Sequence, residues 1–204
     1  MTEAELILAS ASMGRAAILR GAGLAFRQEP AGVDERALEA AAVASSDSGR
    51  VDAGGLALLL AAAKAKDVSV KHPPALVLGA DQVMECEGVL HQKPPTLAAA
   101  RQQLLGLRGR THSLHAALCV AREGRVLWQH LDRARLTMRA FSDAFLDDYC
   151  RSEGDVLLQS VGAYRIEGRG IQLFSTIEGG HFTIIGLPLL PLLGYLRDIE
   201  WLPR

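Results

Sequence analysis

Residues 6–15 read LILASASMGR and carry the first indication of the architecture. The three apolar residues Leu6-Ile7-Leu8 predict a short buried strand. The chain then turns through Ser10 and Ser12 into an apolar helical pattern that closes at Gly21. A helix entrance collects backbone N–H groups and the positive end of the helix dipole, so it suits a phosphate. The same turn also fits an ordinary helix cap, because serine is a favoured N-cap residue.

Strands and helices alternate in the first half of the chain, and hairpins appear in the second half. This order predicts a single α/β domain over residues 1–204 with a mixed sheet, since no linker divides the chain. The residue patterns predict helices at 37–55 (weak, ending in a mobile loop), 56–68, 97–107, 142–149 and 189–196. They predict strands at 6–8, 76–78, 113–121, 126–139, 171–174 and 182–185, with a loop at 160–170.

Composition argues against several classes of protein. There are 22 basic and 23 acidic residues, whereas a protein that coats a nucleic acid polymer needs a basic excess. Cys86, Cys119 and Cys150 form no CxxC pair, which favours free thiols in a reducing compartment. Residues 1–5 carry acids where a signal peptide carries bases, and the uncharged run 182–195 is too short to cross a bilayer of ~30 Å. We therefore expect a cytoplasmic protein with no membrane or nucleic-acid partner.

A carboxylate follows the second apolar strand, in the run Gly79-Ala80-Asp81-Gln82. We expect the strand to end at Gly79 and to leave Asp81 in the loop beyond it. Strand ends are frequent sites of chemistry, because the strand holds the side chain while the loop leaves it accessible. The alternative is an aspartate that only caps the next turn.

A series of short motifs runs in a fixed order from residue 6 to residue 189. They are LILASAS (6–12) with Arg15, VDE (33–35), AKA (63–65), GAD (79–81), KP (93–94), GRTH (109–112), GAY (162–164), IEG (166–168) and GLPL (186–189). This order resembles the Maf family of nucleoside triphosphate pyrophosphatases. The resemblance implies a two-lobed α/β fold of the Maf/ITPase-like kind, with an elongated mixed central sheet and a nucleotide cleft between the lobes. It also implies hydrolysis of a nucleoside triphosphate to monophosphate and pyrophosphate, assisted by Mg²⁺ or Mn²⁺.

The first motif departs from the family pattern, which continues with a proline and two basic or aromatic residues. Here Met13 and Gly14 precede Arg15, so we expect one phosphate or nucleobase contact to be missing. The resemblance implies that Arg15 binds phosphate, for which an arginine fork is well suited. Ser10 and Ser12 are predicted to contact phosphate or ribose.

The resemblance also assigns the catalytic residues. Asp81 matches the general base, and Glu35 is the expected second carboxylate of a shared metal site, with Asp34 as the alternative ligand. Oxygen ligands suit Mg²⁺, which keeps several of its waters. Lys64 and Lys93 are the expected phosphate-binding cations. The Ala- and Gly-rich sequence before Lys64 predicts a loosely packed helix.

Two further positions concern the nucleobase. Gln82 and Glu167 look like the subgroup that acts on 7-methylguanosine triphosphate, with some activity on pyrimidine triphosphates. The subgroup acting on thymidine and uridine triphosphates usually carries Thr and Gln there. A carboxylate accepts from the guanine N1–H and amine, and it attracts a base made cationic by N7 methylation. The alternative is a solvent-exposed Glu167 paired with Arg169.

Two rival functions stay open on the sequence. The first is a nucleotide-binding regulator of cell division with little catalysis, which the combination of Asp81, Glu35, Lys64 and Lys93 disfavours. The second is a house-cleaning enzyme for deaminated purines, which the run Ser10-Ala11-Ser12 disfavours. The oligomeric state is open as well, with a homodimer as one alternative.

Overall fold

The computed structural model describes residues 5–44 and 52–203, which form a mixed sheet flanked by helices. The strands are β1 (Leu6–Leu8), β2 (Arg27–Gln28), β3 (Leu76–Cys86), β4 (Val89–His91), β5 (Thr111–Arg122), β6 (Arg125–Met138) and β7 (Phe174–Glu178). The α-helices are α1 (Met13–Gly21), α2 (Glu35–Ala44), α3 (Ala53–Lys71), α4 (Leu97–Leu107), α5 (Asp143–Glu153), α6 (His181–Ile185) and α7 (Leu189–Asp198). Short 3₁₀ helices, η1 and η2, cover Gly154–Gln159 and Arg169–Leu173.

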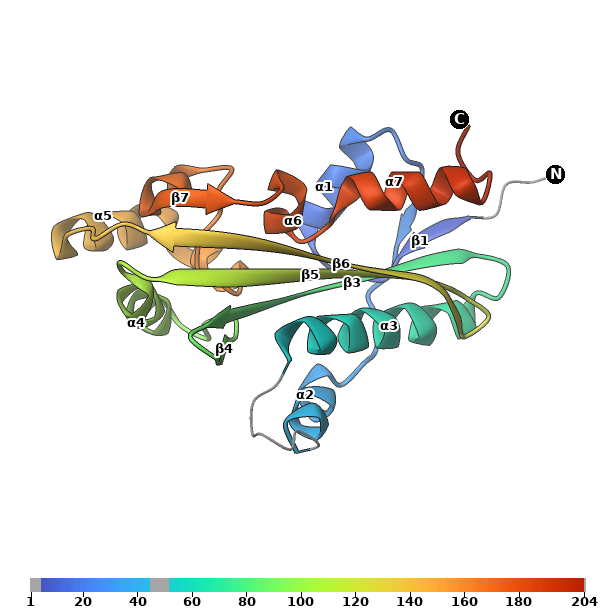
Figure 1. Ribbon diagram of the computed structural model, residues 1–204, viewed down its shortest axis with the longest axis horizontal. Coiled ribbons are helices and arrows are strands. Elements are labelled where there is room, and N and C mark those ends of the chain that lie inside the picture. The colour runs from blue at the N-terminus through green and yellow to red at the C-terminus, as the bar shows by residue number, and fades with distance from the viewer. Residues whose placement is uncertain (1–4, 45–51, 204) are drawn as a thin grey trace.

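The described residues build a seven-stranded sheet in the order β2-β1-β3-β5-β6-β7, with β4 also paired to β3. β1 pairs in parallel with β2 and β3, and the other pairs are antiparallel. The long strands β3, β5 and β6 run side by side along the longest axis of the molecule (Figure 1). The elongated mixed sheet confirms the predicted α/β fold.

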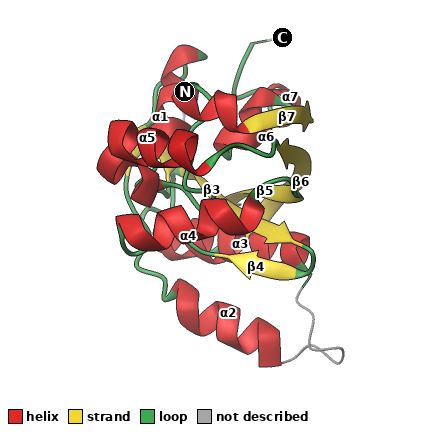
Figure 2. Cartoon of the chain, turned by 90° about the vertical axis from the view of Figure 1, so that its left-hand side faces the viewer, coloured by secondary structure: helices red, strands yellow, loops and turns green. Residues whose placement is uncertain are grey.

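Three hydrophobic clusters hold the helices on this sheet. Two of them lie on opposite faces of one end, where α1 and α7 cover one face and α3 covers the other (Figure 1). The third fills the other end, between the sheet and the helices α4 and α5. Helix α2 lies outside α3, away from the sheet (Figure 2). The sheet is therefore the one element that all three clusters share.

The pleat of β3 sends alternate side chains into the two opposing clusters. Leu76, Leu78 and Ala80 belong to the cluster under α1 and α7. Val77 and Val83 belong to the cluster under α3. Asp81 lies in register with these last two, so it faces α3.

Helix α3 packs against β3 very closely, which corrects the expectation of a loosely packed helix. A Cβ added to Gly79 would lie 2.2 Å from the carbonyl oxygen of Ala61 and 2.7 Å from the nitrogen of Ala65. Both alanines and Ala57 are fully buried. Small residues on α3 permit contact between the two backbones instead of leaving space.

The extent of β3 corrects a second expectation. The strand does not end at Gly79, because β5 pairs with it from Val77 to Glu85. Asp81 therefore lies in the middle of a strand, held by the ladder on one side. The predicted strand–loop boundary is wrong because the local apolar pattern contains no information about pairing with a strand that is distant in the sequence.

Two of the predicted C-terminal strands are also wrong. Residues 182–185 lie in the helix α6, which ends at Gly186 in the left-handed conformation. Residues 171–173 lie in η2, and the strand β7 begins only at Phe174. Periodicity cannot distinguish a strand from a helix in an apolar run of four residues.

The remaining predicted helices and strands are present or lie outside the described residues. The helix expected at 37–55 corresponds to α2 and the start of α3. The loop expected at its end, residues 45–51, lies outside the described part, as do residues 1–4. Ser142 caps α5, which confirms the helix predicted at 142–149. Among the described helices, none combines the length and the apolar character needed to cross a membrane.

Candidate active site

Lys64 lies between two carboxylates. Its Nζ is 2.6 Å from Oδ1 of Asp81 and 2.9 Å from Oε1 of Glu35. The side chains of Lys64 and Asp81 are 11% and 9% exposed, whereas that of Glu35 is 52% exposed. The cluster thus has a buried side at Asp81 and an open side at Glu35. The second oxygen of Asp81, Oδ2, makes no hydrogen bond to the described residues.

The packing of α3 on β3 brings Lys64 to Asp81. Gly79 contacts α3 at Ala61 and Ala65, the residues that bracket Lys64 in the sequence. Asp81 is two residues further along β3 and faces the same helix. The close approach of the two backbones therefore places the ammonium within hydrogen-bonding distance of the carboxylate.

The outer edge of β3 is left without a strand partner at this point. Leu8, the end of β1, pairs with Leu78, and pairing with β4 begins at Met84. Within the described residues no strand covers positions 79–83 on that side. We call this unpaired interval the open edge.

Arg15 fills part of the open edge from α1. Its Nη1 donates to the carbonyl of Ala80 at 2.8 Å and to the hydroxyl of Ser10 at 3.0 Å. Its Nε donates to the carbonyl of Gly186 at 2.9 Å. Burial lowers the pKa of Arg15, while the carboxylates of Asp81 and Glu35 act in the opposite direction. An arginine keeps its charge through such a change, so it stays a cation beside the carboxylates.

The two serines of the first motif organise this loop. The Ser10 hydroxyl accepts from Arg15 and from the backbone N–H of Ser12 at 3.3 Å. The Ser12 hydroxyl accepts from the N–H of Arg15 at 3.3 Å and caps α1. The capping interpretation of Ser12 is therefore confirmed, and the predicted phosphate contacts of both serines stay predictions.

Gln82 reaches the opposite face of the sheet from Asp81. Its Nε2 donates to the carbonyls of Thr183 and Ile184, at 2.9 and 3.0 Å. The hydroxyl of Thr183 in turn donates to Asp132 on β6 at 2.7 Å. Gln82 therefore ties β3 to α6, and its donors are already occupied. Sequence reasoning missed Thr183 and Asp132, because no local pattern links positions so far apart.

Glu35, and not Asp34, is the acid that contacts Lys64. The Asp34 carboxylate accepts from the backbone N–H of Ala37 at 3.0 Å, so it caps the first turn of α2. Glu35 begins that helix and points its carboxylate at Lys64. The choice between the two acids that the sequence left open therefore favours Glu35 as a partner of Asp81.

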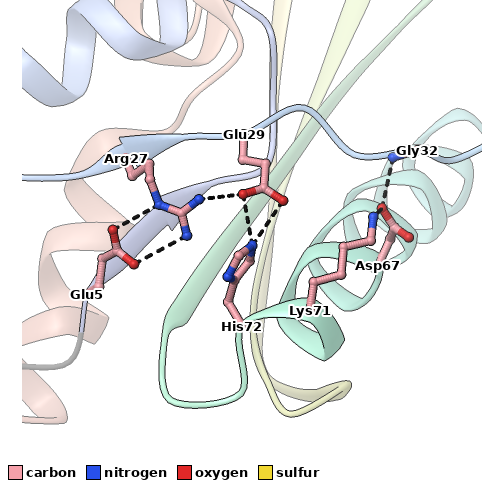
Figure 3. Close-up of polar contacts among 7 residues, drawn as sticks. All are labelled: Glu5, Arg27, Glu29, Gly32, Asp67, Lys71 and His72. Carbon is pink, nitrogen blue, oxygen red and sulfur yellow. Dashed lines mark hydrogen bonds and ion pairs between the residues drawn. The ribbon is translucent and has the colours of Figure 1, made fainter.

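The segment that leads to Glu35 is fastened to α3 by polar contacts (Figure 3). The carboxylate of Asp67 accepts from the N–H of Gly32 at 2.8 Å. Glu29 contacts Nε2 of His72, just beyond α3, at 2.9 Å, and this contact lowers the pKa of Glu29. These contacts fix where the chain enters α2, and hence the position of Glu35, the first residue of that helix.

Lys93 is not brought into the cluster. Its side chain is exposed and makes no hydrogen bond or ion pair to the described residues. Its neighbour Gln92 donates to Glu39 on α2 at 2.8 Å, so this turn does lie beside the helix that carries Glu35. The phosphate contact of Lys93 stays a prediction.

A cavity of about 410 Å³ lies between α1, α6 and the start of α7. Gly14, next to Arg15, and Glu167 both contribute to its wall, which is otherwise mostly apolar. Asp81, Lys64 and Glu35 do not line it, so the cavity and the charged cluster are distinct. Glu167 makes no ion pair or hydrogen bond to the described residues, and Arg169 pairs with Asp148 instead. The Glu167–Arg169 pair considered as an alternative does not form.

The divalent cation that the resemblance implies requires oxygen ligands, and Asp81 and Glu35 are the carboxylates that could supply them. Among the described residues no group of three or more His, Cys, Asp or Glu side chains could hold a metal ion. Mg²⁺ needs only one or two carboxylates when substrate phosphates and water complete its shell. Asp81 and Glu35 already converge on one cation, the Lys64 ammonium. The two carboxylates therefore fit a cation that is shared with a polyphosphate.

Comparison with known proteins gives a consistent picture. Residues 5–199 match the family described as "Maf-like protein". The chain is 49% identical to a nucleoside triphosphate pyrophosphatase of Nitrobacter winogradskyi, covering 97% of this chain and 94% of the relative. It is 50% identical to a 7-methyl-GTP pyrophosphatase of Mesorhizobium japonicum, covering 98% of both chains. A 7-methyl-GTP pyrophosphatase of Rhizobium meliloti is 48% identical, with coverage of 95% and 96%.

Proposed function

This chain belongs to the family of Maf-like proteins, and on that premise we propose that it is a nucleoside triphosphate pyrophosphatase. It hydrolyses a nucleoside triphosphate to the monophosphate and pyrophosphate. The observation that carries the proposal is the cluster of Lys64, Asp81 and Glu35 at the open edge of β3, with Arg15 beside it. Two carboxylates and two cations gathered at one place, with Glu35 on the exposed side, meet the needs of phosphoryl chemistry.

In the proposed mechanism Asp81 is the general base. Its Oδ2 takes a proton from a water molecule, and the water oxygen attacks the α-phosphorus. The bond from the α-phosphorus to the α,β-bridging oxygen breaks, and pyrophosphate leaves with the electron pair. Oδ1 of Asp81 is held by Lys64, so the base keeps a fixed orientation during the transfer.

In the proposed mechanism, cationic side chains bind the polyphosphate. Arg15 holds its guanidinium at the open edge, and Lys64 follows the charge that develops on the leaving pyrophosphate. Lys93 approaches from the turn beside α2. Asp81 and Glu35 would hold a divalent cation, Mg²⁺ or Mn²⁺, which supplies neutralisation of phosphate charge when it is bound.

We propose 7-methylguanosine triphosphate as a substrate, with pyrimidine triphosphates as weaker ones. Two of the relatives described above are named 7-methyl-GTP pyrophosphatases. Glu167 contributes a carboxylate with no partner among the described residues to a largely apolar cavity that adjoins Arg15 through Gly14. Such a wall suits a flat, cationic nucleobase with adjacent N–H donors. We further place this activity in a single domain and in the cytoplasm.

The products test the site of attack, and turnover distinguishes this function from the nucleotide-binding regulator. Attack at the α-phosphorus gives monophosphate and pyrophosphate, whereas attack at the γ-phosphorus gives diphosphate and orthophosphate. We expect pyrophosphate from a sample free of inorganic pyrophosphatase, measured by phosphorus NMR. Orthophosphate as the first product would contradict the site of attack. Binding without turnover would favour the nucleotide-binding regulator.

The assignment of the nucleobase is tested by Glu167→Gln. The variant offers a donor where guanine also presents donors, so kcat/KM for 7-methylguanosine triphosphate should fall by about 10²-fold or more. The value for uridine triphosphate should change far less. Equal losses for both nucleotides would mean that Glu167 does not recognise the nucleobase.

A further inference from the structure

Glu167 lies in a tightly closed turn within the loop of residues 160–170. The N–H of Gly168 donates to the carbonyl of Arg165 at 3.4 Å. A Cβ added to Gly170 would lie 2.4 Å from the same carbonyl oxygen, so the two sides of the turn are in direct contact. Glu167 itself is exposed and faces the cavity. The direction of its carboxylate therefore depends on how this turn is anchored.

A buried hydrogen bond anchors the beginning of the turn. Nε2 of His112, on β5, lies 2.6 Å from the hydroxyl of Tyr164, and either atom can donate. Both residues are buried, at 1% and 6% exposure. Burial lowers the pKa of His112 to about 4, so the ring is neutral at pH 7. The edge of Tyr164 also meets the ring of Phe174, with centroids 4.8 Å apart.

Other contacts hold both sides of the turn. The Ser160 hydroxyl donates to the carbonyl of Tyr164 at 2.8 Å and accepts from its N–H at 3.1 Å. Beyond the turn, Arg169 donates to the Ser152 hydroxyl at 2.8 Å and pairs with Asp148. The His112–Tyr164 hydrogen bond joins this loop directly to the central sheet.

We propose that His112 and Tyr164 are positioning residues for nucleobase recognition, because their hydrogen bond orients the turn that presents Glu167 to the cavity. The inference rests on the nucleobase part of the proposed function. Neither side chain lines the cavity, so both act through Glu167. Loss of the bond should therefore weaken the recognition of guanine derivatives and spare the chemistry at Asp81.

The test compares Tyr164→Phe with a matched control, Tyr195→Phe. The control removes a hydroxyl from a tyrosine of α7 whose ring stacks on Trp128, away from the loop. Affinities for 7-methylguanosine monophosphate and uridine monophosphate are measured by calorimetry, which needs no turnover. Tyr164→Phe should weaken binding of the guanine nucleotide about tenfold and that of the uridine nucleotide less than about twofold. Tyr195→Phe should change neither, and equal losses for both nucleotides in Tyr164→Phe would overturn the proposal.

A double-mutant cycle separates positioning from general damage to the fold. If Tyr164 acts through Glu167, adding Tyr164→Phe to Glu167→Gln should leave the selectivity ratio where Glu167→Gln alone put it. Independent, additive losses would overturn the proposal. His112→Gln breaks the bond from the other side and should reproduce the effect of Tyr164→Phe. Selective binding by the unmodified protein without release of pyrophosphate would refute the proposed catalysis and leave this role intact. No selectivity in the unmodified protein would refute the positioning role.

Discussion

Lys64 connects the two acids of the site, so each residue there depends on its neighbours. A buried ammonium is costly unless it is paired, and here Asp81 and Glu35 both pair with it. When a triphosphate arrives, the lysine can keep its contact with Asp81 and exchange its contact with Glu35 for a phosphate oxygen, so it does not become unpaired. The ion pairs thus hold the Lys64 charge in place although its side chain is only 11% exposed.

The role of Asp81 as a base predicts the effect of Asp81→Asn. The amide keeps the size of the side chain and can still accept from Lys64, but it cannot take a proton at neutral pH. We expect kcat to fall by ~10²–10⁴-fold with little change in the unfolding free energy. Glu85→Gln, four residues along the same strand, is the control and should stay near the unmodified rate. Near-normal turnover of Asp81→Asn at saturating metal would remove Asp81 from the mechanism.

Glu35 is expected to govern the demand for metal. Chelation with EDTA should abolish activity, and added Mg²⁺ or Mn²⁺ should restore it. Glu35→Gln should raise the metal concentration for half-maximal rate, because it removes one anionic ligand. Asp34→Asn is the matched control, since asparagine also caps helices well and Asp34 does not touch Lys64. Full activity in excess EDTA is incompatible with the proposed cofactor.

Among the elements, the contact of α3 with β3 matters most for the site. This contact sets the distance from Lys64 to Asp81, and Gly79 makes it possible because any side chain there would meet the helix backbone. The open edge of β3 is a second feature that depends on the lengths of whole elements. It exists because β1 ends at Leu8 and β4 begins to pair with β3 only at Met84.

Gly79→Ala should therefore damage both stability and activity. The added methyl must push α3 away, and overpacking of this kind costs about 1–3 kcal/mol of unfolding free energy. Gly106→Ala is the control, because that helical glycine has no neighbouring atom within 4 Å of an added Cβ. It should raise the unfolding free energy by up to about 1 kcal/mol. Denaturant unfolding measures the unfolding free energy of each variant. If Gly79→Ala leaves the unfolding free energy unchanged, α3 and β3 are not packed this closely.

At the level of the whole molecule, the site joins distant parts of the chain. Arg15 on α1, Lys64 on α3 and Asp81 on β3 meet at one place, and Gly186 near the C-terminus accepts from Arg15. A ligand held by such a site binds only the folded state, so it should stabilise the entire protein.

A substrate analogue with a methylene between the α- and β-phosphorus atoms tests this coupling. At a hundred times its Kd, together with Mg²⁺, it should raise the unfolding free energy by about 2.7 kcal/mol. Asp81→Asn should keep most of this stabilisation while losing turnover, whereas Lys64→Met should lose most of it. Equal stabilisation of Lys64→Met and the unmodified chain would place the polyphosphate elsewhere.

The sequence by itself determined the features that depend on neighbouring residues. The patterns at 6–8, 113–121 and 142–149 predicted two strands and a helix that the structure contains. The order of strands, helices and hairpins was enough to predict the mixed sheet, and the order of motifs drew attention to Lys64 and Asp81 before any contact between them was known. These signals are local because turns, caps and side-chain periodicity act over a few residues.

Only the tertiary structure decided where those residues lie relative to one another. Pairing with β5 carries β3 through Asp81, α6 replaces an expected strand, and Gln82 is engaged by Thr183 rather than left free. The cavity beside Glu167 likewise arises from segments remote in sequence. Strand pairing and helix packing depend on distant partners, with contacts in the site that join residues from 17 to 171 positions apart. Closing such loops costs conformational entropy, which is offset only when the whole core forms. A local pattern carries no record of those partners, so the geometry of the site emerges only in the folded chain.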